Sequence, residues 1–430
     1  MEETLIEEGE SNREGGEVSP ALIAVHPLEK SLAVSIGSEL RVFDLIEDCS
    51  ISLVDDSGGP LHSDSIRAIC FGANGKLFAS AGDDKLVKVW TTNPWRCIST
   101  VIAEKRVSAV AISHDGLFVS FADKFGVVWV TGTDGDHEAK EKASPLFGHY
   151  CSIITSLEFS PDGRFIVSAD RDFKIRVTVF PKNPFSGAHE IQSFCLGHTE
   201  FVSCLSFVCT QEHPQGFLLS GSGDSTVRLW DVRSGSLLDT CEVGSEAGLS
   251  ECDGKEENVC PAITDICTSA DGSIVAVGIQ SLHGVVLLSC DLSARTLSVI
   301  KLVSMGGTFV PTSLDMSSSA ERLWMVTGAS NLPALDCPSF TRLRVISGLK
   351  KCGSDSSDYE PAVVEDNEIP GGMKLIEKLQ GSGSNAKEED LLAVAEAVKA
   401  AMRNQLIKRQ YSVEKRELRK KRRNDRKIKI

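Results

Sequence analysis

Short apolar runs separated by turn residues fill the chain from Ala21 to about Ser347. ALIAV at 21–25, SLAVSIG at 31–37 and LRVFDL at 40–45 are the first of these runs. Runs of this length, bounded by Gly, Ser, Asp or Pro, are typical of β-strands. The pattern therefore predicts an all-β fold over this part of the chain.

The segment 197–231 is the clearest repeating unit. It opens with a Gly-His pair, contains two apolar runs and ends with a Trp-Asp pair. These features are the signature of a WD repeat, a unit of about 40–45 residues that forms one propeller blade. Its second half has the spacing Ser220-x3-Asp224-x5-Trp230.

Other parts of the chain repeat this spacing in full or in part. The matches are Ser80/Asp84/Trp90, Ser168/Asp172 with Thr178 in place of tryptophan, and the pair Asp123/Trp129. His62 and His149 stand where His198 opens the strongest unit. Together with degenerate copies, unit starts fall near 21, 62, 106, 148, 197, 261 and 309. The sequence predicts a seven-bladed WD-repeat β-propeller over 21–347, and six or eight blades stay open because the terminal repeats are weak.

The remaining segments lack the blade pattern. Residues 1–20 are acidic and are predicted to be disordered, and an acidic insertion at about 242–259 separates the fifth and sixth units. Residues 348–385 contain Gly, Ser, Asp and Pro clusters and are predicted to be a linker. Residues 386–430 are predicted to form a helix, to about 410, followed by a basic tail.

A capping box and an apolar stripe support this C-terminal helix. Asn385 and Glu388 have the spacing of the capping box. The stripe at helical spacing consists of Leu391, Ala395, Val398, Met402 and Leu406. It fits docking on the propeller or on a partner, and the sequence does not choose between them.

Composition narrows the class of protein. The chain is 41% hydrophobic, and no apolar run approaches the roughly 18 residues that a membrane span needs. The N-terminus lacks the features of a signal peptide, so we expect the protein to stay inside the cell. The 14 cysteines form no CxxC pair, which favours reduced thiols and argues against a zinc site.

Charge is unevenly distributed. The net charge is −15, yet residues 403–430 carry 13 Lys and Arg against three Asp and Glu, so the preceding residues carry −25. Such a tail suggests an anionic partner. Its basic clusters are Lys408, Arg409, Lys420, Lys421, Arg422 and Arg423. They fit a nuclear import signal, contacts to nucleic-acid phosphates, or a solubilising tail.

Candidate chemistry is structural rather than catalytic. His198, Ser220, Asp224 and Trp230 are predicted to form the hydrogen-bonded tetrad of a WD repeat, because histidine can bridge the serine and the carboxylate. A hydrolase triad is the alternative for these residues, but no nucleophile elbow accompanies them. No P-loop, HExxH or dinucleotide-binding motif occurs. We therefore predict a binding platform without catalytic residues, metal or cofactor.

Three segments are more specific than a generic WD repeat. ADKFG at 122–126, SPDGRFIVSADRDFKIRV at 160–177 and IQSFCLGHTEFV at 191–202 closely resemble the WD-repeat, non-catalytic subunit of the tRNA (guanine-N7) methyltransferase heterodimer. The resemblance is best from about 106 to 235. It implies that the chain binds and stabilises a separate catalytic subunit, which uses S-adenosylmethionine to form N7-methylguanosine at position 46 in the tRNA variable loop. The reading of the basic tail as an import signal predicts a nuclear location, with the cytoplasm left open.

The charged segment 170–176 is the candidate interface. Arg171, Lys174 and Arg176 add charge to a blade that lacks the closing tryptophan. Arg176 is the first choice, because a guanidinium can pair bidentately with a partner carboxylate. The alternative class is a general WD-repeat adaptor, for example in ubiquitin ligation or ribosome assembly. An independent enzyme is not expected.

Overall fold

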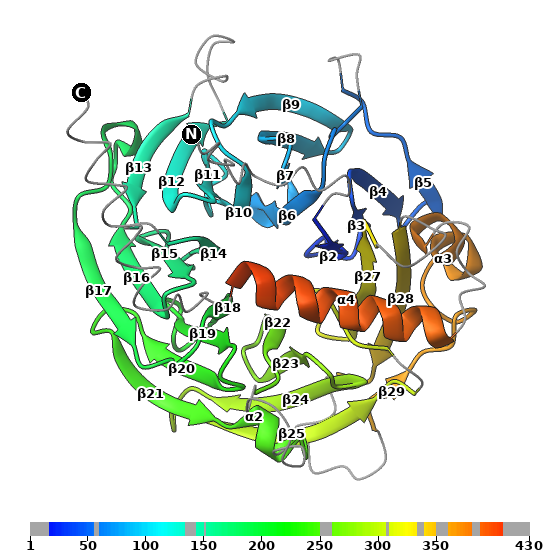
Figure 1. The fold of residues 1–430 in the computed structure, drawn as a ribbon. Helices are drawn as coiled ribbons and strands as arrows, with labels where there is room; N and C mark the ends of the chain where they lie inside the picture. Colours follow the sequence, from blue (N-terminus) through cyan, green and yellow to red (C-terminus); the bar gives the residue numbers. More distant parts are fainter. Residues whose placement is uncertain are drawn as a thin grey trace, which may run out of the picture.

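Seven antiparallel β-sheets stand around a central channel in the computed structural model (Figure 1). The structure describes residues 17–55, 60–133, 143–149, 152–249, 260–306, 309–332, 339–349, 360–380 and 388–406. Six sheets have four strands and the seventh has five. Each sheet is one blade, so the predicted seven-bladed WD-repeat propeller is confirmed.

Blades 1 to 4 follow one another along the chain. Blade 1 contains β2 (Leu22–Val25), β3 (Ser31–Ile36), β4 (Glu39–Asp44) and β5 (Cys49–Ile51). Blade 2 contains β6 (Ile66–Gly72), the 3-10 turn Ala73–Gly75, β7 (Leu77–Gly82), β8 (Leu86–Thr92) and β9 (Trp95–Ile102). Blade 3 contains β10 (Val107–Ile112), β11 (Phe118–Asp123), β12 (Val127–Gly132) and β13 (Ser144–Gly148). Blade 4 contains β14 (Ile154–Phe159), β15 (Phe165–Asp170), β16 (Lys174–Val179), the 3-10 turn Pro184–Ser186 and β17 (Ile191–Leu196).

Blades 5 to 7 complete the ring. Blade 5 contains β18 (Val202–Val208), β19 (Phe217–Ser222), β20 (Val227–Asp231) and β21 (Ser236–Cys241), followed by the short helix α2 (Val243–Glu246). Blade 6 contains β22 (Ile263–Thr268), β23 (Ile274–Ile279), β24 (Gly284–Asp291) and β25 (Thr296–Ser304). Blade 7 contains β26 (Ser313–Met316), β27 (Arg322–Ser330), β28 (Ser339–Ser347), β29 (Ala362–Val363) and β1 (Ser19–Pro20).

The core lies between neighbouring blades rather than inside any one of them. The second strands β15, β19 and β23 are buried along their whole length, because other blades cover both faces of each sheet. One cluster joins Leu219 and Val227 of blade 5 to Ile266 and Val275 of blade 6. A single blade could not bury these side chains, which explains why the fold requires the complete set.

Hydroxyl groups near the starts of four inner strands tie one blade to the next. Each donates a hydrogen bond to a backbone carbonyl of the following blade. The bonds are Ser108 to Ile154 (2.7 Å), Thr155 to Val202 (2.5 Å), Thr264 to Pro311 (3.1 Å) and Thr312 to Ala21 (2.8 Å). Serine and threonine at these positions therefore help to fix how one blade is placed against the next.

The ring is closed by the N-terminus. β1 pairs antiparallel with β27, with Ser19 opposite Ser330 and Pro20 opposite Ala329. The Asp315 carboxylate accepts the backbone N–H of Val25 at 2.7 Å, so blade 7 is also fastened to blade 1. The prediction of disorder through residue 20 was therefore wrong for residues 17–20, because the last sheet uses them as an added strand.

The region after blade 7 is more ordered than its composition predicts. The predicted linker 348–385 contains β29 and the helix α3 (Gly372–Gln380). Leu375, Ile376 and Leu379 of α3 are buried against blades 1 and 7. The helix was not predicted, because Gly and Pro clusters lie beside it and its buried face has only three apolar residues.

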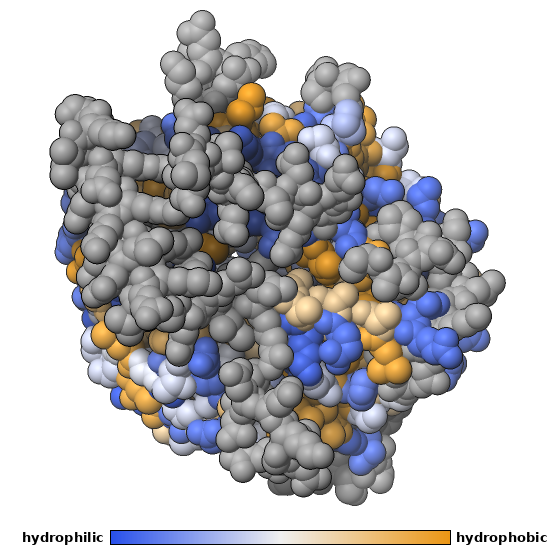
Figure 2. All heavy atoms as spheres, viewed as in Figure 1, coloured by the Kyte–Doolittle hydropathy of each residue, from blue (hydrophilic) through white to orange (hydrophobic). Residues whose placement is uncertain are grey.

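Helix α4 (Glu388–Leu406) lies across one face of the ring (Figure 1). Leu391, Val394 and Val398 pack against Ala329 and other residues of blade 7. Figure 2 shows both hydrophilic and hydrophobic residues along its outer side, where Leu392 is 46% exposed. Of the two options that the sequence left open, the structure has the helix docked on its own propeller. Asn385 and the side chains of residues 402–406 lie outside the described part.

None of the helices in the described ranges is long and apolar enough to cross a membrane. The ten described cysteines are free thiols. Five of them are buried, and burial raises the pKa of Cys195 to about 12. Thiols in this state are poor nucleophiles and poor metal ligands.

Candidate partner-binding surface on the α4 face

We call the side of the ring that carries α4 the α4 face; it also carries the turns between the second and third strands. In blade 5, Trp230 Nε1 donates to Ser220 Oγ at 2.8 Å, and Ser220 Oγ lies 2.7 Å from His198 Nε2. His198 Nδ1 lies 2.9 Å from Asp224 Oδ2. The four side chains singled out in the sequence are thus hydrogen-bonded in series.

The blade 5 tetrad fastens a loop to a turn. Burial alone would raise the pKa of the Asp224 carboxyl, but hydrogen bonds from His198, Thr226 and the backbone N–H of Thr199 hold that pKa below its usual range. Blade 2 repeats the arrangement with His62, Ser80, Asp84 and Trp90. Because the serine hydroxyl is engaged on both sides, these sets stabilise the blades and have no free nucleophile.

Blade 4 departs from the predicted spacing. His149 Nδ1 lies 2.8 Å from Asp170 Oδ2, whereas the repeat pattern assigned this role to Asp172. Asp170 Oδ1 also accepts the backbone N–H groups of Asp172 (2.8 Å) and Lys174 (3.1 Å). The assignment to Asp172 was wrong. Asp170 stands at the end of β15, where one of its carboxylate oxygens caps the turn and the other reaches the histidine.

Blade 3 also has an aspartate at the end of its second strand, Asp123, but this carboxylate bonds to no histidine among the described residues. Asp123 Oδ1 accepts the backbone N–H groups of Phe125 and Val127, and its Oδ2 accepts Trp129 Nε1 at 3.0 Å. The predicted Asp-Trp pair is therefore in direct contact, with no serine between. Blades 3 and 4 form a distinct pair within the ring.

The three predicted interface cations do not gather at one point. Lys174 is exposed, and Arg176 is partly buried on the same strand. The Arg176 guanidinium lies 4.5 Å from the Phe147 ring centroid and donates to the Gly148 carbonyl at 3.1 Å and to Thr178 Oγ1 at 3.0 Å. Burial lowers the pKa of Arg176. Much of its bonding capacity is thus satisfied within the propeller.

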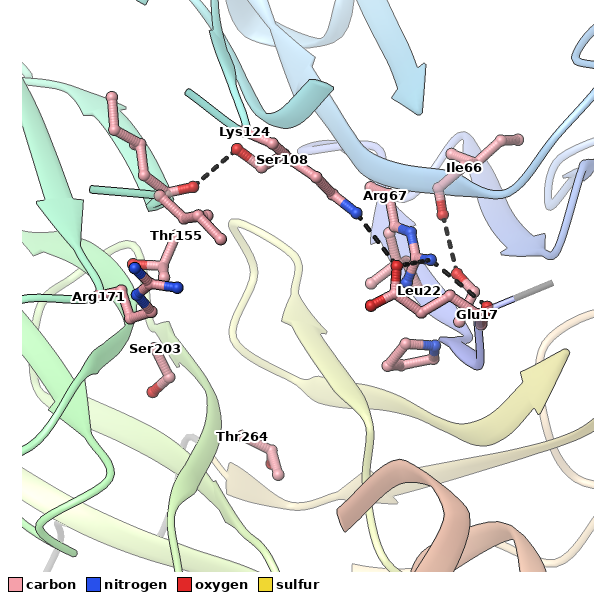
Figure 3. Close-up of a pocket in the computed structure, with 14 residues that line it drawn as sticks. Glu17, Leu22, Ile66, Arg67, Ser108, Lys124, Thr155, Arg171, Ser203 and Thr264 are labelled. Atoms are coloured by element: carbon pink, nitrogen blue, oxygen red, sulfur yellow. Dashed lines mark hydrogen bonds and ion pairs between the residues drawn. The ribbon is translucent and has the colours of Figure 1, made fainter. Parts of the chain in front are cut away.

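Arg171 points into the mouth of the central channel (Figure 3). The cavity there measures about 440 Å³, and Arg67 and Lys124 also line it. Arg67 pairs with Asp83 at 2.6 Å, and Lys124 pairs with Glu17 at 3.3 Å and with Asp83 at 3.2 Å. Among the described residues, Arg171 Nε has no hydrogen-bond partner.

Two exposed aromatic side chains flank these cations. Phe125 is 65% exposed and Phe173 is 36% exposed, at the tips of equivalent turns in blades 3 and 4. Lys105 Nζ lies 5.3 Å from the Phe125 ring centroid. Sequence analysis missed these aromatics as candidates, although apolar residues at turn tips, where polar residues are usual, are a detectable signal. Aromatic and basic groups together on one face suit a protein partner.

Carboxyl groups line the other end of the channel. A cavity of about 480 Å³ is lined by Glu158, Asp265 and Asp315, from blades 4, 6 and 7. Desolvation, followed by the Asp265 and Asp315 charges, raises the pKa of Glu158 to about 8. Desolvation also raises the pKa of Asp265 to about 6 and that of Asp315 to about 7.

The predicted basic clusters of the tail lie outside the described residues. These are Lys408, Arg409, Lys420, Lys421, Arg422 and Arg423. The structure therefore leaves their role as a prediction.

The architecture and the repeated tetrads define a WD-repeat β-propeller. A model described as the WD domain, G-beta repeat, matches residues 60–91, and one described as the tRNA methyltransferase TRM82 WD40 domain matches residues 131–329. The solved structure titled "Crystal structure of RRP9 WD40 repeats" aligns with a TM-score of 0.58 at 20% identity, over 72% of this chain and 88% of that one. At that identity it supports the fold alone.

Sequence relatives are more specific. The tRNA (guanine-N(7)-)-methyltransferase non-catalytic subunit wdr4 of Xenopus laevis is 31% identical over 409 residues, which are 92% of this chain and 94% of the relative. WDR4 of Homo sapiens is 39% identical over 221 residues, 50% of this chain and 51% of that protein. The chain belongs to the family of tRNA (guanine-N7) methyltransferase non-catalytic subunits. The predicted resemblance is confirmed, and a general adaptor is not supported.

Proposed function

We propose that this chain is the non-catalytic subunit of a tRNA (guanine-N7) methyltransferase and that it binds and stabilises the catalytic subunit. The similarity to a named non-catalytic subunit over nearly the full length of both chains carries this conclusion. The internal hydrogen bonding of the His-Ser-Asp sets agrees with it, since these residues hold turns together.

The chemistry then belongs to the partner. We infer that the catalytic subunit binds S-adenosylmethionine and forms N7-methylguanosine at position 46 of the tRNA variable loop. The isolated chain should transfer no methyl group from S-adenosylmethionine to tRNA. Loss of the protein should remove 7-methylguanosine from tRNA, measured by mass spectrometry of nucleosides, and the full chain should restore it. Unchanged 7-methylguanosine in its absence would contradict the proposed function.

We further propose that the partner contacts the α4 face where blades 3 and 4 meet. The exposed side chains there are Lys105, Phe125, Phe173 and Lys174, next to Arg171 and Arg176. Cations beside apolar side chains fit a partner surface that offers carboxylates around an apolar patch. The propeller already uses two hydrogen bonds of the Arg176 guanidinium, so the partner would contact the part of this group that remains free.

Charge reversal tests this interface. Lys174→Glu should weaken co-purification of the catalytic subunit by about tenfold or more, because an attractive pair becomes repulsive. Arg176→Glu should weaken it similarly while the propeller stays folded, as judged by its circular dichroism. Lys182→Glu is the matched control, since Lys182 is exposed on the loop after β16. Equal recovery of the partner with all three variants would reject the assignment.

We infer that the basic tail directs the protein to the nucleus. The density of Lys and Arg at 420–423 supports this location. Replacing these four residues by alanine in the full chain should shift a fluorescent fusion toward the cytoplasm. An unchanged nuclear signal would instead favour a role for the tail in RNA contact.

A further inference from the structure

A groove on the side of the ring opposite α4 combines basic side chains with an apolar floor. It measures about 260 Å³ and runs across blade 5, from Phe165 of blade 4 to Arg295 of blade 6. Phe217 and Val232 are buried and form its floor, and Arg233 lines its wall. Neither the tetrads nor the proposed partner surface uses this groove.

Three arginines surround the groove from three different blades. Arg233 and Arg295 line it and are exposed. The Arg164 guanidinium lies 5.5 Å from the ring centroid of Phe165, a lining residue. Within the described ranges, none of the three forms an ion pair or a side-chain hydrogen bond. The groove is therefore a local concentration of arginine side chains without ion pairs, on a body that carries −25 outside residues 403–430.

The carboxylate of Asp231 also lines the groove, but the turn of blade 5 uses it. Asp231 Oδ1 accepts the backbone N–H of Arg233 at 2.9 Å, and Oδ2 accepts the Ser234 hydroxyl at 2.9 Å. These donors compensate part of its charge. The arginine side chains are left to interact with a ligand.

Arg295 has a backbone conformation that costs free energy. Its φ is +58°, in the left-handed region, and it stands four residues after Asp291. Gly235 has the same place in blade 5, four residues after Asp231, with φ +73°. Glycine adopts this conformation without the steric cost that an arginine incurs. Asp48 of blade 1, four residues after Asp44, has a similar φ of +52°, so this position of the turn accommodates residues other than glycine. The backbone conformation therefore does not by itself assign a role to Arg295, but it means that a glycine fits there without strain.

We propose that this groove binds the phosphate backbone of RNA. Guanidinium groups pair bidentately with phosphate oxygens, and three of them along one groove suit successive phosphates better than a single small anion. Because the rest of the body is acidic, RNA is attracted only where positive charge is concentrated. The proposal rests on the proposed function, since it extends the contact with tRNA to this chain.

Binding of a labelled tRNA transcript to the isolated full chain tests the proposal, measured between about 50 and 200 mM salt. Arg233→Ala and Arg295→Gly should each weaken binding by about fivefold at low salt and reduce the slope of log K against log salt by about one. Arg295→Gly is especially informative, because glycine relieves the backbone cost and the variant should be at least as stable as the parent. Lys76→Ala is the control, since Lys76 is exposed in the turn between the first two strands of blade 2, on the same side of the ring.

Three outcomes would overturn the proposal: binding that both arginine variants leave unchanged, an equal loss with Lys76→Ala, or absence of RNA binding by the parent chain. Binding of polyglutamate is measured in parallel. If the arginine variants bound polyglutamate more weakly but tRNA as well as the parent does, the groove would bind an acidic protein and the RNA assignment would be wrong. Because the isolated chain is used, the result is independent of the catalytic subunit. Co-purification of that subunit reports separately on the proposed function.

Discussion

At the scale of single residues, Asp170 and Asp172 show where a repeat pattern stops being informative. The spacing from Ser168 predicted Asp172 as the partner of His149, but the bond is to Asp170. Sequence spacing identifies which turn supplies the carboxylate, since the turn is fixed by strand pairing. Of two carboxylates in one turn, it identified the one that reaches the imidazole in blade 2, where His62 bonds to Asp84, but not in blade 4, because this depends on side-chain direction. The tetrad of blade 5, with one Asp in reach, was predictable for that reason.

Replacing each aspartate in turn measures this difference. Asp170→Asn should lower the free energy of unfolding by about 1–3 kcal/mol, because it weakens a buried charge-assisted bond and a turn cap. Asp172→Asn should have a smaller effect, since this side chain does not bond to His149. Urea denaturation followed by tryptophan fluorescence gives both values. A larger loss for Asp172→Asn would restore the assignment made from spacing.

The raised pKa of Glu158 predicts a dependence of stability on pH. Folding favours the protonated carboxyl, so this stabilisation is fully present below the ordinary pKa of 4.5 and is lost as pH rises through about 8. Glu158→Gln should therefore raise the free energy of unfolding at pH 9 by about 2 kcal/mol, a value reduced because the side chain reaches the water of the channel. At pH 4 the variant should gain little. Urea titrations at the two pH values would refute this if both changes were equal.

At the scale of elements, strands were predictable and the C-terminal helices were only partly so. Strands recur with similar turns, so each weak copy is supported by the stronger ones. Helix α3 has no repeat, and its buried face consists of Leu375, Ile376 and Leu379, too short a pattern to stand out among Gly and Pro clusters. The start of α4 was predicted to within two residues and its docked face in part: Leu391 and Val398 of the predicted stripe are buried, but Val394 rather than Ala395 lies between them.

Docking of α4 can be tested with a pair of matched substitutions. Val394→Asp should release the helix from blade 7 at a cost of about 2–4 kcal/mol, because a carboxylate would enter an apolar contact. Leu392→Asp should have little effect, since Leu392 is 46% exposed on the same helix. Hydrogen exchange of residues 388–401 reports the release, while exchange in the blades should not change. Equal protection in both variants would show that the apolar contact does not hold the helix.

At the scale of the whole molecule, the ring depends on a contact that no local pattern predicts. β1 has two residues, yet it extends the sheet of blade 7. The adjoining Val18 packs against α4, and its carbonyl accepts Arg67 Nη1 at 3.2 Å. The acidic composition of the N-terminus indicated disorder because such a segment cannot form a core alone. Its partner sheet, assembled from residues about 300 positions later, provides the missing surface.

Two truncations separate this closure from the acidic segment before it. Removal of residues 1–20 should lower the free energy of unfolding by about 3 kcal/mol, because the β1 pairing and the contacts of Val18 and Ser19 are lost. Removal of residues 1–16 should have little effect, since Glu17 and β1 remain. Thermal unfolding followed by circular dichroism measures both. Equal stability of the two truncated proteins would mean that β1 does not close the ring.

The closure of the ring by the N-terminal segment has a consequence for how the protein is made. The ribosome releases Val25 long before Asp315, which accepts its N–H from 290 positions away. During synthesis, the apolar face that blade 1 presents to blade 7 therefore stays exposed to solvent until blade 7 has been synthesised. A nascent chain halted after blade 6 should need chaperone protection, whereas one halted after residue 349 should be able to form the ring.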